Sequence, residues 1–385
     1  MEVVAAALAV IIILGLQAWI FNKFAFRKLE YKCGFSVPEA YEGDEVLLVE
    51  TIRNKKLLPL PWLKVDIHSS RWLDFAGTCS VITQDDRRVT SSFMLRSYQR
   101  TTRRWKLKCL KRGVFVTENV TLICGDLLNR SNVSIPSRVD ARIVVYPEIL
   151  KLEEMLVPVN LIQGDSIVNR WIVEDPFIVG GVREYQPSDQ LGRIHWPATA
   201  KEGRLMVKKN EFTSQLSLTV ILNMQSTMYE YNSVMNRDIA EYGIKVAATL
   251  IDRALAEDMP VRLCTNGYTV DTPGEAIDSG ESAGREHIQS LMRILASLAL
   301  KSCKDIETLL EAFDGSIERS SIVLITSYLT KEMILQLNSL KQNMNTVKVI
   351  LLENNYDQSL FQEDIDCYIL EWKEEDRLMS GYDQP

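Results

Sequence analysis

The stretch that decides how this chain is organised runs from Gly180 to Trp196 and reads GGVREYQPSDQLGRIHW. It combines a Gly-Gly pair and a Pro-Ser-Asp turn with Arg, Glu, Asp, His and Trp side chains, which need partners outside a simple apolar core. Short alternating apolar segments precede it, whereas apolar runs that alternate with helical patterns follow it. We therefore predict that the segment 150–213, which contains this stretch, joins two different domains.

Length and composition set the broad class. A chain of 385 residues with 46% hydrophobic and 25% charged residues is typical of a globular protein of two or three domains. Its formal net charge of −7 argues against a general nucleic-acid-binding protein. The seven cysteines are scattered, with no CxxC pair and no histidine at metal-ligand spacing. The cysteine pattern indicates neither a zinc site nor a redox motif, and it is typical of reduced thiols in the cytosol.

The first residues predict a membrane anchor. The run from Val3 to Phe21 is almost unbroken in apolar side chains, and about 19 helical residues span roughly 30 Å of hydrocarbon. The alternative is a cleaved signal peptide, but no basic residues precede the run and no small-residue cleavage site closes it. Basic residues follow the run, which by the positive-inside rule places the amino terminus outside the cell. We expect a single-pass protein of the cell membrane, with residues 1–32 as anchor and linker and the later domains in the cytoplasm.

Residues 33–149 predict a β-sandwich. Apolar and polar residues alternate in seven short runs, at 45–52, 62–67, 88–95, 104–109, 114–117, 120–124 and 141–146. Turn residues such as Gly43 and Gly125 separate them, as is typical of an all-β sandwich. Two explanations are open for the basic residues Arg96, Arg100, Arg103 and Arg104, namely contact with anionic lipid or a charged strand edge that resists aggregation. No group of residues in this domain is typical of an active site.

Residues 214–385 predict a mostly parallel sheet covered by helices. Apolar runs at 216–222, 261–264, 322–325 and 347–352 have the composition of buried strands. Helical patterns lie between them, including one marked by Ile239, Tyr242, Val246 and Leu250. Ligands of such folds sit at the carboxyl ends of the strands. The segments 223–227 and 326–328 occupy those positions here.

Several motifs carry a resemblance to a known family. They are Glu42-Gly43-Asp44, Lys111-Arg112-Gly113-Val114, Gly125-Asp126, Tyr146-Pro147, Arg183-Glu184-Tyr185-x-Pro-x-Asp189-x-x-x-Arg193-x-His195-Trp196 and Gly203-x-Leu205-x-Val207-Lys208. In this order, and over nearly the whole chain, they closely resemble the bacterial family catalogued as domain of unknown function 58, DUF58. The resemblance implies that the carboxyl-terminal domain is similar to a von Willebrand factor type A domain. The expected fold class is thus an α/β, type A-like (Rossmann-like) domain at 214–385 plus an all-β sandwich, preceded by one transmembrane helix.

The family resemblance also implies partners. Members commonly have one or two amino-terminal spans, and their genes typically lie beside those of MoxR-type AAA+ ATPases and transglutaminase-like membrane proteins. Their biochemical activity is largely undefined. A membrane and these two kinds of protein are therefore the expected partners, with no nucleic acid and no small-molecule substrate.

The chain departs from type A domains at the metal motif. Domains that bind a divalent cation use Asp-x-Ser-x-Ser after the first strand, because a carboxylate and two hydroxyls are hard oxygen ligands for Mg²⁺. Asn223, Gln225 and Thr227 stand at those three positions, and the later strand ends in Thr326-Ser327. A neutral amide cannot balance the cation's charge, so we expect no metal and no other cofactor. The polar rim that also includes Ser226 is instead a possible docking face for a protein.

The joining stretch admits catalytic and structural interpretations. Asp189 and His195 could form a carboxylate–imidazole pair, with Arg193 beside them, but no nucleophile elbow and no phosphate-binding loop accompany them. Its basic residues could instead bind a phosphate or an acidic surface. The structural interpretation is that the signature residues brace the two domains; they are Arg183, Glu184, Tyr185, Asp189, Arg193, His195, Trp196 and Lys208.

These observations favour a non-enzymatic protein. We expect a membrane-anchored cytoplasmic scaffold that offers a docking face to a MoxR-type AAA+ ATPase or to a neighbouring membrane protein. The alternative is an enzyme that acts on a phosphorylated or cell-envelope substrate through Asp189, His195 and Arg193.

Overall fold

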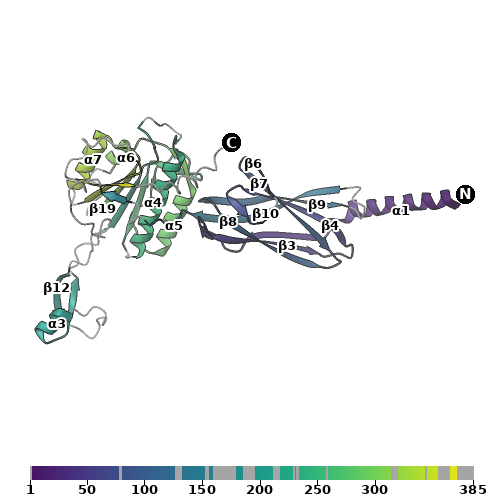
Figure 1. Cartoon of the computed structure of the whole chain (residues 1–385), viewed down its shortest axis with the longest axis horizontal. Coiled ribbons are helices and arrows are strands. Elements are labelled where there is room, and N and C mark those ends of the chain that lie inside the picture. The colour runs from purple at the N-terminus through teal and green to yellow at the C-terminus, as the bar shows by residue number, and fades with distance from the viewer. Residues whose placement is uncertain are drawn as a thin grey trace. The chain divides into compact units, whose positions relative to one another are not determined.

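The computed structural model divides the chain into two compact units. Unit 1 consists of residues 1–148 and 295–297, and unit 2 of residues 149–294 and 298–385. Figure 1 draws the helices and strands of both. The structure describes residues 2–77, 80–125, 132–151, 156–158, 179–184, 196–210, 217–228, 230, 234–256, 259–313, 317, 320–342, 345–353 and 365–370.

Unit 1 is a helix followed by a β-sandwich. Helix α1 (Glu2–Phe24) precedes one sheet of order β1-β3-β8-β5 and a second of order β2-β10-β9-β4-β7-β6. The predicted sandwich is therefore confirmed. Its strands are β1 (Leu29–Phe35), β2 (Glu39–Tyr41), β3 (Glu45–Asn54), β4 (Leu60–Ser70), β5 (Leu73–Phe75), β6 (Ser80–Thr83), β7 (Asp86–Leu95), β8 (Arg100–Cys109), β9 (Gly113–Gly125) and β10 (Asn132–Tyr146).

Alternating side chains account for these strands. Along β3, Val46, Leu48 and Ile52 are buried, whereas Glu45 and Arg53 at the same strand's ends are exposed. The inward side chains of both sheets form one apolar core. Each fully buried Leu or Ile contributes about 1.5–3 kcal/mol relative to an exposed one, so the alternation fixes which face of each strand is inside.

Strand β4 changes its neighbours along its length. It pairs with β9 only as far as Ile67 opposite Val120, while its pairing with β7 continues to Ser70 opposite Asp86. Strand β9 itself continues to pair with β10 as far as Gly113. β4 and β9 therefore part after Ile67, and this leaves one side of β9 before Val120 without a ladder partner among the described strands.

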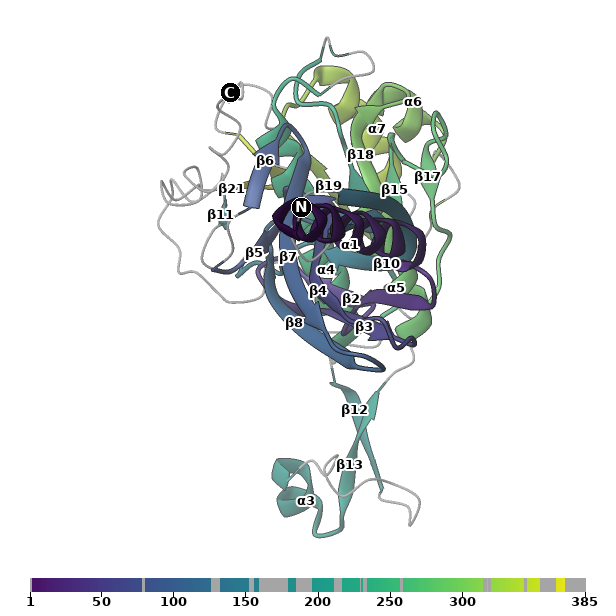
Figure 2. The same ribbon diagram turned by 90° about the vertical axis from the view of Figure 1, so that its right-hand side faces the viewer.

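Unit 2 is built on a seven-stranded sheet of order β11-β21-β20-β19-β14-β15-β17. The strands from β21 to β15 run parallel, and the two edge strands β11 and β17 are antiparallel to their neighbours. Helix α4 packs on β14 and β19, and α7 packs on β20. Figure 2 shows the paired strands β12 and β13 together with α3. The elements are β11 (Leu156–Pro158), β12 (Val179–Glu184), α3 (Trp196–Glu202), β13 (Met206–Asn210), β14 (Ser217–Leu222), α4 (Arg237–Ala256), β15 (Val261–Thr265), β16 (Gly267–Thr269), β17 (Ile277–Asp278), α5 (Arg285–Ser297), β18 (Leu298–Ser302), α6 (Ile306–Glu311), β19 (Ser320–Thr326), α7 (Lys331–Gln342), β20 (Thr346–Leu351) and β21 (Asp366–Leu370).

Close packing at Gly243 positions α4 on the sheet. A Cβ atom added there would lie 3.0 Å from Leu352 Cδ1 and 3.2 Å from Leu222 Cδ1, so a glycine lets the helix approach the strand ends. The helix begins after Asn236, whose Oδ1 accepts a hydrogen bond from the backbone N–H of Ile239. This hydrogen bond caps the first turn of α4.

Two of our predictions need correction. The fold class, an α/β von Willebrand factor type A-like domain plus a sandwich behind one transmembrane helix, is wrong as a description of this chain, because the described residues form 21 strands and only six helices. Among the residues that the structure describes, no helix has the length and apolar character needed to cross a bilayer. The prediction of a single-pass cell-membrane protein with its amino terminus outside is therefore wrong as well.

Candidate functional site

Polar side chains converge at the carboxyl edge of the seven-stranded sheet. Asn223 follows β14, Asn266 follows β15, and Thr326 ends β19. All three are buried, and so are Gln225, Ser226 and Ser327. Because neighbouring parallel strands end at the same edge, residues about a hundred positions apart in sequence meet here.

Amides and hydroxyls pair with one another in this cluster. Asn223 donates from Nδ2 to Thr326 Oγ1 at 3.0 Å, and its Oδ1 accepts from Asn266 Nδ2 at 3.0 Å and from the backbone N–H of Gln225 at 3.1 Å. Asn266 Oδ1 accepts from the backbone N–H of Met224 at 2.8 Å. An amide both donates and accepts, so Asn223 and Asn266 satisfy each other and their neighbours without a charge.

Gln225 links the cluster to the next loop. Its Nε2 donates to Asp305 Oδ1 at 3.1 Å, and its Oε1 accepts from Asn266 Nδ2, from the backbone N–H of Ile306 and from the Tyr328 hydroxyl. Burial raises the pKa of Tyr328 to about 12, so its hydroxyl stays protonated and remains a donor at neutral pH. With a further bond from Nε2 to the Glu230 carbonyl, the Gln225 side chain therefore makes five hydrogen bonds.

A buried carboxylate orders the loop before α4. Glu230 accepts hydrogen bonds from the backbone N–H of Ser226 at 2.8 Å, from the Ser226 hydroxyl, and from the backbone N–H of Met235 at 3.0 Å. The Ser226 hydroxyl in turn accepts from the backbone N–H of Asn236. Sequence reasoning missed Glu230, although a lone acidic residue between two apolar segments was a visible signal.

Only part of the predicted docking rim reaches the surface. Of the six residues predicted there, five are buried and Thr227 is exposed. Two methionines of the same loop extend the exposed part, Met228 with 48% and Met235 with 79% of its surface accessible. The described residues hold no group of three or more His, Cys, Asp or Glu that could bind a metal ion. Among the described residues, this edge therefore exposes two apolar side chains beside polar ones, while most of its amides and hydroxyls are buried.

The signature residues lie on two paired strands, a short helix and a part outside the described residues. Arg183 and Glu184 end β12 opposite Val207 and Met206 of β13, and Lys208 lies opposite Val182. Trp196 begins α3 and is 66% exposed, so it does not act as a core side chain there. Tyr185, Asp189, Arg193 and His195 lie outside the described residues.

Comparison with known families matches the second half of the chain. The model described as "Protein of unknown function DUF58" matches residues 181–363. This match supports the DUF58 family. It includes the hairpin β12–β13, the carboxyl-edge cluster and most of the seven-stranded sheet, and it assigns no activity to them. The comparison with curated proteins finds no match.

Solved structures resemble about a third of the chain. A non-cellulosomal cohesin from the archaeon Archaeoglobus fulgidus is 10% identical, covers 32% of this chain and 94% of its own, and has a TM-score of 0.22. The CARDB domain of the PF1109 protein from Pyrococcus furiosus is 11% identical over 32% of this chain and 98% of its own, with a TM-score of 0.21. A PapD-like domain of human CEP192 is 13% identical over 31% and 86%, with a TM-score of 0.20. The first two are β-sandwich domains rather than type A domains, and scores this low support no functional conclusion.

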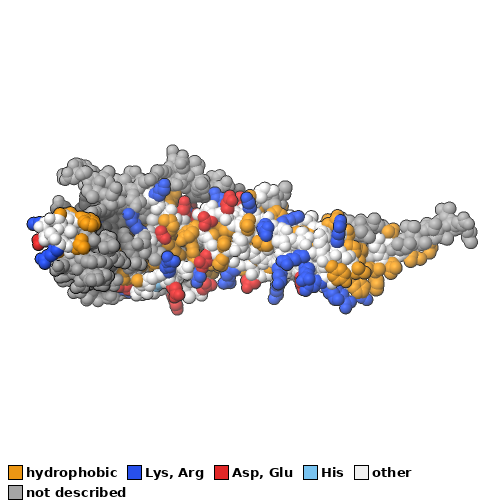
Figure 3. Space-filling model, turned by 90° about the horizontal axis from the view of Figure 1, so that it is seen from below, with side chains coloured by type: hydrophobic (Ala, Val, Ile, Leu, Met, Phe, Trp, Pro, Cys, Tyr) orange, Lys and Arg blue, Asp and Glu red, His pale blue; other side chains and the backbone are white. Residues whose placement is uncertain are grey.

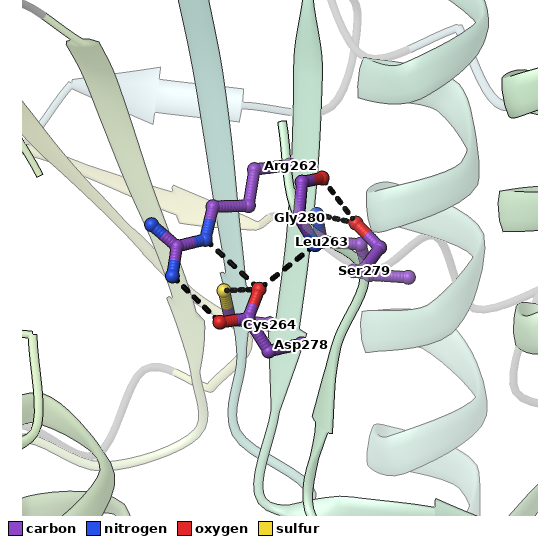
Figure 4. Close-up of polar contacts among 6 residues, drawn as sticks. All are labelled: Arg262, Leu263, Cys264, Asp278, Ser279 and Gly280. Carbon is purple, nitrogen blue, oxygen red and sulfur yellow. Dashed lines mark hydrogen bonds and ion pairs between the residues drawn. The ribbon is translucent and has the colours of Figure 1, made fainter. Parts of the chain in front are cut away.

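The DUF58-matching region also contains a cysteine beside an ion pair. Arg262 forms two hydrogen bonds with Asp278, from Nε at 2.9 Å and from Nη2 at 2.6 Å, and Cys264 Sγ lies 3.6 Å from Asp278 Oδ1 (Figure 4). Burial, and next the negative charge of Asp278, raise the pKa of Cys264 to about 12. The thiol therefore stays protonated at neutral pH and is not an activated nucleophile. The ion pair instead holds edge strand β17 to β15.

Unit 1 buries a carboxylate that we did not predict. Glu50 of β3 is fully buried and accepts hydrogen bonds from the Tyr31 hydroxyl at 3.1 Å, from the Ser91 hydroxyl at 3.2 Å and from Trp105 Nε1. Burial raises the pKa of this carboxyl, and the three donors oppose the rise. The signal was present in the sequence, because Glu50 shares its strand face with the apolar residues Leu48 and Ile52.

The basic residues of β8 fall on two sides of the strand. Arg100 and Arg104 are exposed, as are Lys106 and Lys108, and the side chains of Lys and Arg gather visibly on unit 1 in Figure 3. Arg103 is half-buried, and its guanidinium lies 4.5 Å from the ring centre of Phe93. The alternation therefore makes a charged outer face on this strand, while Arg103 contributes to packing.

Proposed function

We propose that this chain is a non-catalytic scaffold that binds a protein partner through the carboxyl edge of its seven-stranded sheet. One observation carries the proposal. Buried amides and hydroxyls at this edge bond to each other, and the loop beside them exposes Met228 and Met235 next to the polar side chains of Thr227 and Asn236. Exposed methionines adapt their shape to an apolar partner and are common at binding surfaces.

The interior cluster supports this role by fixing the loop that carries the methionines. Glu230 binds both ends of the loop, at Ser226 and at Met235, so the apolar side chains are presented from a preorganised backbone. Preorganisation lowers the entropy that an interface loses on binding. We propose a MoxR-type AAA+ ATPase as the partner, and a transglutaminase-like membrane protein as the second candidate, because the DUF58 resemblance implies both.

Binding of the purified ATPase to the full chain tests the proposal. The measurement is interferometry with and without ATP on the wild type, on Met235→Glu, and on Met94→Glu as a matched control with an exposed methionine in unit 1. We expect Met235→Glu to weaken binding by roughly tenfold or more, since a charge in the centre of an apolar contact is left unpaired. Equal binding by all three proteins would remove this surface from consideration, and no binding by the wild type would reject the ATPase as partner.

A further inference from the structure

A second binding site is indicated in unit 1, where β4 and β9 part. A cleft with a volume of about 410 Å³ lies at this point. It is lined by residues of β4, of the turn into β7 and of the first half of β9, namely His68, Ser69, Ser70, Asp85, Asp86, Val114, Phe115, Val116, Glu118 and Asn119. We propose that this cleft binds an extended peptide segment with a basic side chain, which adds as a strand to β9.

The backbone of β9 provides the first part of the argument. From Val114 to Glu118 this strand pairs with β10 on one side, and β4 has already turned away on the other. In an antiparallel pair, alternate residues direct their N–H and C=O groups toward each neighbour. Half of the backbone groups in this part of β9 therefore point to the side where β4 is missing, and an extended peptide could bond to them.

The negative charge of the cleft favours a bound peptide that carries a basic side chain. Asp85, Asp86 and Glu118 are three exposed carboxylates among its lining residues. His68 is held by a 2.7 Å contact between its Nδ1 and Asp86 Oδ2. Arg71 lies 4.0 Å from Asp85, and the lining residues themselves include three carboxylates but no Lys or Arg. A Lys or Arg side chain of a bound peptide would complement this charge.

A buried hydroxyl marks the cleft independently of its charge. Ser69 lines the cleft and is only 4% exposed, and its Oγ has no hydrogen-bond partner in the part of the chain that the structure describes. A buried polar group without a partner costs free energy that a ligand can recover by bonding to it. Sequence reasoning could not find this site, because it depends on where two strands separate.

The test uses the full chain and two fluorescent heptapeptides of alternating Thr and Val. One has a central Arg, and the control peptide has a central Glu but is otherwise identical. In fluorescence anisotropy, we expect the Arg peptide to bind at least tenfold more tightly than the Glu control peptide. Its binding should weaken as the salt concentration is raised. Asp86→Asn and Glu118→Gln should each weaken it roughly threefold to fivefold, which is the range for exposed charge pairs. Glu45→Gln, an exposed carboxylate of β3 in the other sheet, is the matched control and should leave binding unchanged.

Hydrogen exchange then distinguishes strand addition from simple charge attraction. Bound Arg peptide should slow exchange of the amides between Val114 and Glu118, with little change elsewhere in unit 1. Equal affinity for the two peptides would overturn the proposal, as would binding without protection of these amides. Amides that are already protected in the free chain would also overturn it, because another part of the chain would then cover this edge. Glu118→Gln keeps the test valid if Asp86→Asn fails to fold.

Discussion

The two units bury polar side chains in contrasting ways. In the sandwich, the buried carboxylate of Glu50 accepts bonds from three neutral donors. At the carboxyl edge of unit 2, Asn223 and Asn266 both donate and accept within a set of amides and hydroxyls. The Glu50 arrangement depends on the protonation of one group, whereas the amides of Asn223 and Asn266 carry no charge, and the carboxylates of Glu230 and Asp305 bond only at the margin of their cluster.

This contrast shows two ways in which a fold can bury polar side chains. A carboxylate only accepts, so a cluster of carboxylates needs a metal or protons to avoid repulsion. An amide brings its own donor, and here the Nδ2 of Asn223 bonds to the Thr326 hydroxyl. The sandwich, by comparison, keeps its carboxylate because Trp105 and two hydroxyls supply the donors.

Replacing the amide of unit 2 by a carboxylate should have the largest effect. Asn223→Asp removes the donor to Thr326 and places a charge where no described cation is available, so we expect a loss of about 4 kcal/mol in the unfolding free energy of unit 2 at neutral pH. Urea unfolding with pulsed hydrogen exchange, read on peptides from β14 and β19, measures it. The loss should shrink toward pH 5, as the new carboxyl takes up a proton.

Asn132→Asp, at an exposed position of β10, is the control and should change stability little. An Asn223→Asp variant as stable as the wild type would mean that the cluster accommodates a charge. The distinction between the two units would then fail.

Sequence patterns predicted the strands of this cluster but not the cluster itself. The apolar run at 216–222 is confirmed as β14, the run at 322–325 lies within β19, and the helical pattern from Ile239 to Leu250 lies within α4. Burial of successive apolar side chains explains this success, because it acts locally. Asn266, however, reaches Asn223 only because β15 lies beside β14, and strand order is not encoded in either strand alone.

The predicted rim and anchor show two further limits of reading the sequence. Asn223, Gln225 and Thr326 look like surface residues by polarity, yet mutual hydrogen bonds allow them to be buried. Conversely, the many apolar residues between positions 3 and 21 predicted a membrane-spanning helix, and the structure does not confirm it. Polarity and hydropathy describe single residues, whereas burial depends on the partners that the fold supplies.

Removing the carboxylate of the sandwich should have the next largest effect. Glu50→Ala leaves the Trp105 N–H and the Tyr31 and Ser91 hydroxyls without their acceptor and opens a cavity, so we expect unit 1 to lose about 3 kcal/mol. Pulsed hydrogen exchange in urea, read on peptides from β3 and β8, provides the measurement. Glu45→Ala on the same strand is exposed and should cost far less. A similar loss in both variants would show that strand propensity, rather than the buried network, is responsible.

Replacing Glu50 by its neutral isostere Gln should stabilise unit 1, whereas Glu50→Ala destabilises it. Burial raises the pKa of Glu50 in the folded chain above its unfolded value, so the folded state keeps a proton that the unfolded state has released. Stability should therefore fall as pH rises from the unfolded to the folded pKa. Glu50→Gln keeps an acceptor for Trp105 and abolishes this dependence, and we expect a gain of about 1 kcal/mol at pH 8. A pH profile of unit 1 as steep in Glu50→Gln as in the wild type would assign the dependence to another group.

The edge ion pair of unit 2 should give the smallest effect, with the opposite dependence on pH. A hydrogen bond from Arg262 lowers the pKa of Asp278 in the folded chain, so its contribution is present above the unfolded pKa and is lost as pH falls through the folded pKa. The Asp278 side chain is 43% exposed, and solvent therefore screens the pair. We expect Asp278→Asn to cost about 0.5 kcal/mol at pH 7 in low salt and less in 1 M salt, measured by hydrogen exchange of β15 and β17 peptides. A loss of several kcal/mol in stability that does not depend on salt concentration would instead mean that the edge strand detaches. Asp278 also accepts a hydrogen bond from the Gly280 N–H, which shapes the turn after β17.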